Sequence, residues 1–186
     1  MATLSTIHAA ALLAAVALST QSVAAPLKVD AGKSTVGAVF KQLNVPVEAK
    51  FKKFAAAIDF DSAKPENSKA GLDIDIPSFD LGDPEYNSEV LKKDWFNAAQ
   101  FPKASFVSTG MKADGAGKLT VAGTLTIKGK ATSVNFPLAY KKDGNAFVFD
   151  GSLPIKRLTY GVGDGEWRDT STVADEVVIK FNVVAQ

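Results

Sequence analysis

The sequence predicts an all-β fold, an antiparallel barrel of about eight strands with one short helix inserted between strands. Three observations indicate this fold. Apolar and polar residues alternate with period two in several segments, which is typical of half-buried strands. Turn signals that contain glycine separate some of these segments. One stretch, residues 83–96, has a helical pattern instead. Closure of the sheet into a barrel would remove exposed strand edges and leave room for one small ligand.

The N-terminal half predicts strands that are less regular. One apolar alternation runs through residues 45–51, and a second with the opposite phase runs through residues 54–60. The phase changes at Lys52-Lys53, so we expect a bulge, bend or turn there. Residues 72–76 alternate apolar side chains with Asp73 and Asp75 and predict a half-exposed strand.

Residues 83–96 predict the helix. Asp83 can cap its N-terminus with Pro84 in the first position, and Asn87 is the alternative cap. Val90, Leu91 and Trp95 form a short apolar stripe, and Phe101-Pro102 ends the segment.

Residues 119–149 predict an antiparallel meander. Lys128-Gly129 and Asp143-Gly144 supply its two turns. The last strand, within residues 173–183, has the cleanest alternation in the chain. The apolar faces of these strands consist of Leu119, Val121, Leu125, Ile127, Val134, Phe136, Leu138, Tyr140, Phe147, Phe149, Val173, Val177, Ile179, Phe181 and Val183.

Residues 1–25 predict a cleaved signal peptide and therefore a periplasmic protein. An Ala-rich apolar run at 9–18 is followed by Val23-Ala24-Ala25, which favours cleavage after Ala25. Residues 26–186 then form one domain with no transmembrane span. The single histidine, His8, lies in the leader and the chain has no cysteine. The mature protein therefore has no imidazole or thiol for catalysis or metal binding, which favours a binding protein over an enzyme.

The net charge of +1 argues against a nucleic-acid partner, because such proteins carry a basic stripe. We expect an apolar small-molecule lipid as the partner. The sequence leaves a homodimer open.

Several short motifs together carry a family resemblance. They are Ser34-Thr35-Val36, Ile58-Asp59-Phe60-Asp61, Asp94-Trp95-Phe96-Asn97, Phe101-Pro102-Lys103-Ala104-Ser105-Phe106, the run from Val121 to Gly129, and Lys156-Arg157-Leu158-Thr159-Tyr160-Gly161. With them the chain resembles the YceI-like family over nearly all of residues 26–186. Two departures are Lys33 and the run Glu89-Val90-Leu91-Lys92, at places where many relatives carry histidine.

The resemblance implies a lipocalin-like barrel in the periplasm whose interior takes a long isoprenoid chain, such as that of a quinone. It implies no required cofactor other than such a bound lipid. The alternation of apolar residues indicates an apolar interior independently. The residues expected to line that interior are Phe106, Val121, Leu125, Ile127, Val134, Phe136, Leu138, Phe147, Phe149, Val177, Ile179 and Phe181.

Five further residues are expected at the mouth of the barrel: Trp95, Arg157, Tyr160, Trp167 and Arg168. Arg157 and Arg168 are the only arginines in the chain and flank the segment from Tyr160 to Trp167. Either could bind a polar lipid head with its planar guanidinium. The alternative is a structural role, in which an arginine stacks on Trp95 or Trp167 and closes the barrel end.

Two other functions remain as alternatives. The carboxylates within residues 164–176 could serve a hydrolase, although solvated loop charges explain them more simply. The barrel core could instead be filled, and its loops could bind partner proteins. The glycines at 161, 163 and 165 do not form a nucleotide-binding loop, because that motif requires a following helix.

Overall fold

The computed structural model describes residues 26–186. The expected signal peptide, its cleavage after Ala25 and His8 lie outside the described residues. Within the described part of the chain, no helix is both long and apolar enough to cross a membrane.

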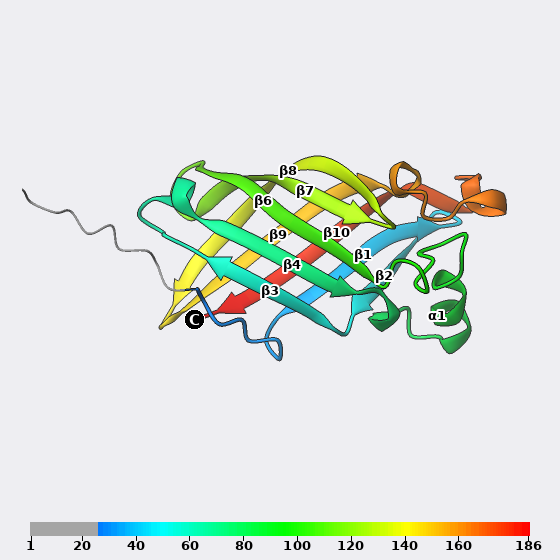
Figure 1. Cartoon of the computed structure of the whole chain (residues 1–186), viewed down its shortest axis with the longest axis horizontal. Coiled ribbons are helices and arrows are strands. Elements are labelled where there is room, and N and C mark those ends of the chain that lie inside the picture. Colours follow the sequence, from blue (N-terminus) through cyan, green and yellow to red (C-terminus); the bar gives the residue numbers. More distant parts are fainter. Residues whose placement is uncertain (1–25) are drawn as a thin grey trace, which may run out of the picture.

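The protein is a ten-stranded antiparallel sheet that curls into a half-barrel, with helix α1 (Pro84–Val90) at one end (Figure 1). The sheet order is β3-β4-β6-β7-β8-β9-β10-β1-β2-β5. The strands are β1 (Thr35–Gln42), β2 (Val45–Phe51), β3 (Phe54–Asp59), β4 (Lys69–Asp75), β5 (Phe79–Asp80), β6 (Lys103–Ala113), β7 (Lys118–Ile127), β8 (Lys130–Asp143), β9 (Ala146–Lys156) and β10 (Val173–Ala185).

The predicted all-β class and the single short helix are confirmed, but the strand count of eight is wrong. Strand β1 passes through Gly37 and ends in polar Lys41 and Gln42, which obscures its alternation. Strand β5 has two residues, too few to show a period. The two terminal strands of this order, β3 and β5, are not paired with each other within residues 26–186, so the sheet is curled rather than fully closed.

The meander forms as the turn chemistry requires. Lys128 and Gly129 have φ values of 49° and 73°, and Ile127 pairs with Lys130 across them. Two residues with positive φ give the type I′ hairpin that matches strand twist. Strand β7 is buried at every second residue, as expected from Leu119, Val121, Leu125 and Ile127.

The helix is shorter than its predicted segment. The Asp83 carboxylate accepts hydrogen bonds from the backbone N–H groups of Glu85 and Tyr86, so Asp83 is the cap. Asn87, the alternative cap, instead accepts from the Leu81 N–H and donates to Asp80. The alternation changes phase between β2 and β3, and the chain bends there at Lys52, which is one of the three predicted outcomes.

The two ends of the half-barrel are filled differently. Helix α1 and two of the four short 3-10 helices within residues 26–186, η3 (Arg157–Tyr160) and η4 (Gly165–Arg168), lie at one end, away from the C-terminus (Figure 1). The rest of the interior holds an aromatic cluster in which the Phe60 ring contacts the rings of Tyr140, Phe147 and Phe149 at centroid distances of 4.9–5.2 Å. Close packing of this kind leaves space for a ligand only elsewhere in the barrel.

Candidate functional site

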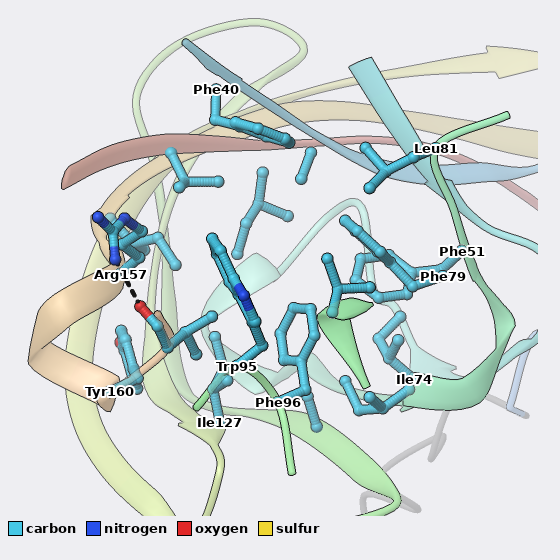
Figure 2. A pocket seen from close by; sticks show the side chains of 18 of the residues that line it. Phe40, Phe51, Ile74, Phe79, Leu81, Trp95, Phe96, Ile127, Arg157 and Tyr160 are labelled. Atoms are coloured by element: carbon cyan, nitrogen blue, oxygen red, sulfur yellow. Dashed lines mark hydrogen bonds between the residues drawn. The ribbon is translucent and has the colours of Figure 1, made fainter. Parts of the chain in front are cut away.

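A cavity of about 420 Å³ occupies the end of the half-barrel that carries α1. Its walls come from strands β1, β2, β4, β5, β6, β7, β9 and β10, from α1 and from the short 3-10 helices η2 (Ile76–Ser78), η3 and η4. Almost all of its surface is carbon, including Phe40, Phe51, Phe79, Leu81 and Phe96 (Figure 2). Enclosed apolar cavities of about 300–1,000 Å³ are the usual form of small-molecule sites.

Five of the twelve expected lining residues border this cavity: Phe106, Leu125, Ile127, Val177 and Ile179. The other seven do not line it. They are Val121, Val134, Phe136, Leu138, Phe147, Phe149 and Phe181, which belong to the packed core. All seven are buried or partly buried. Alternation reports which face of a strand is buried, but it does not report how far along the barrel a residue lies.

A row of aromatic rings marks where the cavity stops. The Phe106 ring lines the cavity and lies 5.5 Å from the Phe136 ring, which in turn lies 5.7 Å from the Phe181 ring. Two of these rings pack directly against glycines, where a side chain would leave no room for them. A Cβ at Gly123 would lie 2.3 Å from the Phe106 ring, and one at Gly151 would lie 2.5 Å from the Phe181 ring.

The residues that sequence reasoning missed come mostly from the N-terminal half. Phe51 belongs to the predicted alternation of residues 45–51, but that pattern does not indicate that the residue lines the cavity. Phe79 and Leu81 lie around the two-residue strand β5 and offered no periodic signal. Phe40 lies in β1, whose alternation is obscured.

Arg157 is buried and is fully engaged within the protein. Its guanidinium donates to five backbone carbonyls, those of Ala174, Val162, Gly163, Trp167 and Val173, at 2.7–3.1 Å. Because a guanidinium has five N–H donors, none remains for a ligand. Burial lowers the pKa of Arg157, and the charges of Asp175 and Asp164 oppose that shift.

The Trp95 ring stands beside this arginine. The Arg157 Cζ atom lies 5.7 Å from the Trp95 ring centroid, and the Trp167 ring lies 5.2 Å away. Figure 2 shows Trp95 projecting into the cavity between Arg157 and the group of Phe51 and Phe79. Trp95, Trp167, Arg157 and Tyr160 all border the cavity. Arg157 therefore has the structural role that the sequence offered as an alternative, in which an arginine stacks on Trp95 at the end of the barrel.

Tyr160 is 2 % exposed, and burial raises the pKa of its hydroxyl, while a hydrogen bond with the Thr132 side chain opposes the shift. Lys128 ties the adjoining hairpin to this end of the barrel, because its Nζ donates to the Gly161 carbonyl at 2.6 Å. Burial lowers the pKa of Lys128.

Arg168 does not border the cavity. Its Nη1 lies 2.8 Å from the Asp164 carboxylate in an ion pair whose arginine side chain is 68 % exposed. A solvated pair of this kind contributes little to stability. The structure therefore separates the two arginines that the sequence treated alike.

Three of the five carboxylates within residues 164–176 have structural partners. Asp164 pairs with Arg168, Asp169 accepts from the Ser171 N–H and Asp175 accepts from the Leu158 N–H. Among residues 26–186, no three acidic, histidine or cysteine side chains converge as metal ligands would.

A second, more open hollow of about 810 Å³ is bordered by charges of both signs, including Lys50, Lys180, Asp114 and Asp150. Apolar residues such as Leu119, Leu138 and Phe181 also border it, so its lining is mixed, whereas that of the cavity at α1 is mainly apolar.

Comparison with known proteins places this fold. The YceI-like domain family matches residues 27–185. The chain belongs to this family. The crystal structure of Burkholderia cenocepacia BcnA is 53% identical to this YceI-like protein, with a TM-score of 0.84, and covers 86% of this chain and 100% of BcnA.

Two other relatives of this YceI-like protein are more distant. A protein of Azotobacter vinelandii described as a UPF0312 protein is 27% identical over 72% of this chain and 70% of its own length. The structure of a polyisoprenoid binding domain from Saccharophagus degradans has a TM-score of 0.67 at 19% identity and covers 88% of this chain and 98% of that domain. At that identity the likeness concerns the fold.

Proposed function

We propose that this protein binds a long-chain isoprenoid, quinone-like or other apolar lipid in the cavity at the α1 end of the half-barrel. The observation that carries the proposal is the cavity itself, which is lined by aromatic and aliphatic side chains from eight strands and α1. A long apolar chain is the ligand that such walls favour. The name of the Saccharophagus degradans domain, which binds polyisoprenoid, agrees with this ligand class.

The physical basis is transfer of apolar surface out of water. Each CH₂ group of the lipid that enters the cavity contributes about 0.8 kcal/mol. Binding must also offset the lost freedom of the ligand, so a lipid with many buried carbons is required for useful affinity. Binding of this type needs no cofactor, and the lipid is the cargo.

The proposed setting is the periplasm, after removal of residues 1–25. There the protein carries or sequesters its lipid between membranes, because a free isoprenoid chain is nearly insoluble in water. The partners of Asp164, Asp169 and Asp175 give no support to the hydrolase, and the cavity gives none to a completely filled core.

Native mass spectrometry of protein purified from its own periplasm tests the proposal. We expect a mass that begins at Pro26 together with a bound lipid that organic solvent extracts. Protein that carries no lipid and takes up no added polyprenyl quinone or hydrocarbon would contradict lipid binding. The same spectrum distinguishes monomer from homodimer, and retained residues 1–25 would contradict processing.

A further inference from the structure

The buried polar side chains at the cavity, with one exception among the described residues, are satisfied by the protein itself. Arg157 uses its five donors on backbone carbonyls, and the Tyr160 hydroxyl pairs with Thr132. One group differs. Among the buried side-chain nitrogens and oxygens of residues 26–186, Trp95 Nε1 is the one without a hydrogen-bond partner.

An unpaired buried N–H is costly and rare in native proteins. The desolvation of such a donor costs about 1–3 kcal/mol. Most buried donors have a protein or water partner, and exceptions call for an explanation such as an absent ligand. Trp95 borders the cavity, so an occupant of the cavity is the natural source of the missing acceptor.

The Trp95 ring is held in place and cannot easily turn toward another acceptor. The Arg157 guanidinium and the Trp167 ring pack against it, as described above. The backbone next to the ring is also fixed. The backbone N–H of Trp95 donates to the Lys92 carbonyl, and the Asp94 carbonyl accepts from the backbone N–H groups of Gly163 and Asp164. Neighbouring side chains cover Nε1, so small rotamer changes of the kind common on binding are needed for a ligand to reach it.

We propose that Trp95 Nε1–H donates a hydrogen bond to an uncharged oxygen of the bound lipid, such as a quinone carbonyl, an ether or an alcohol. This proposal rests on the proposed function and specifies the head group. The donor fixes where along the cavity the oxygen lies. Trp95 is therefore a specificity-determining residue, in addition to forming part of the wall.

The same geometry disfavours an anionic head such as a phosphate. Within the described chain, no lysine borders the cavity, and its single arginine has no free N–H. Asp83 adds negative charge at the cavity border, and the other carboxylate there, that of Glu89, pairs with Lys92 outside the lining. An isoprenoid phosphate would therefore lose its water without gaining charged donors.

The test compares Trp95→Phe with the unsubstituted protein against a polyprenyl quinone and a polyprenyl hydrocarbon of matched length. Phenylalanine keeps an aromatic ring in the wall and removes the N–H. We expect quinone affinity to fall about threefold to tenfold, the effect of one net hydrogen bond, while hydrocarbon affinity changes much less. Trp167→Phe, which alters the stacking partner, should affect the two lipids alike. A polyprenyl phosphate should bind more weakly than the quinone.

A second measurement follows lipid binding by the unsubstituted protein, so it does not depend on a variant that still binds lipid. The mature chain has two tryptophans, so its NMR spectrum has two indole N–H resonances, which Trp167→Phe assigns. The Trp95 resonance should move downfield with the quinone and not with the hydrocarbon. Equal losses for both lipids in Trp95→Phe, or an unmoved resonance with quinone bound, would overturn the hydrogen bond. Failure of the unsubstituted protein to bind either lipid would overturn the proposed function instead.

Discussion

The Arg157 guanidinium lies against the face of Trp95, with Cζ 5.7 Å from the ring centroid, while its N–H groups hold five backbone carbonyls. These carbonyls belong to the loop at 162–167 and to the start of β10. One side chain therefore joins the loop, the strand and the ring that borders the cavity. Its role is structural, and it shapes the wall without offering the ligand a donor.

Arg157→Lys should strongly destabilise the protein. Lysine has at most three donors and lacks the planar fork, so at least two buried carbonyls lose their partner. At about 1–3 kcal/mol for each unpaired group, the free energy of unfolding should fall by at least about 2 kcal/mol. Denaturant unfolding measures the change. Arg168→Lys is the control, since its exposed ion pair should leave stability within about 1 kcal/mol. Equal stabilities of the two variants would contradict the structural role of Arg157.

Gly163→Ala should disturb the same assembly from the other side. Gly163 has a φ of 75°, and a Cβ there would lie 2.3 Å from Arg157 Nη1 and 3.1 Å from the Trp95 ring. Alanine would be strained in its backbone and would displace both side chains. Gly144→Ala is the matched control, because Gly144 has a φ of 59° and nothing within 4 Å of its Cβ.

Thermal melting compares the two variants. Gly144→Ala should show the backbone cost of about 1 kcal/mol, and Gly163→Ala a distinctly larger loss. If both variants lose the same stability, backbone strain alone explains the effect.

Acid should loosen the attachment of α1. The Asp80 pKa is lowered to about 2 by hydrogen bonds from Lys52, Asn87 and Gly82. Its Oδ1 accepts from Asn87 Nδ2 at 2.8 Å, which links β5 to α1. A lowered pKa stabilises the folded state above the unfolded pKa near 4, and this stabilisation is lost as pH falls toward 2.

Asp80→Asn should therefore flatten the fall of stability between about pH 4 and pH 2. Asp143→Asn, which removes an exposed carboxylate from the β8 hairpin, is the control. Unfolding at a series of pH values measures both slopes. Parallel curves for Asp80→Asn and the unsubstituted protein would show that Asp80 does not contribute to the acid response.

Sequence reasoning reached the fold class but only part of the cavity. Period-two patterns and turn glycines act locally, so β7, its hairpin and the Asp83 cap could be recognised. The division of the interior depends on side chains that meet across the sheet, such as Phe60 with Phe149. Leu125 and Val121 therefore read alike in the sequence, although one borders the cavity and the other is packed.

The same reason separates Arg157 from Arg168. Their residue type and loop setting are alike, and only the folded chain brings five carbonyls around one of them. No local pattern could have identified Trp95 Nε1 as an unpaired donor, because that property depends on every neighbour of the ring.

The Phe106–Phe136 contact should set the length of lipid that the cavity accepts. The rings lie 5.5 Å apart, with Phe106 bordering the cavity and Phe136 behind it. Phe136→Ala removes the second ring and should extend the cavity toward Phe181. The substitution should lower stability by about 3–5 kcal/mol, as is usual for a buried phenylalanine.

Phe136→Ala should also shift preference toward longer polyprenyl chains, because each further CH₂ that finds space contributes about 0.8 kcal/mol. Gly123→Ala is the opposing variant. Its Cβ would lie 2.3 Å from the Phe106 ring and 2.6 Å from the Val107 carbonyl oxygen, so it should displace both that ring and the adjoining backbone of β6, and we expect shorter chains to be preferred. Gly110→Ala, also in the sheet and with nothing within 4 Å of its Cβ, should leave chain-length preference unchanged. Affinities for a series of polyprenyl hydrocarbons measure the three profiles. Folded Phe136→Ala and Gly123→Ala variants with the same length preference would show that these rings do not form the end of the lipid site.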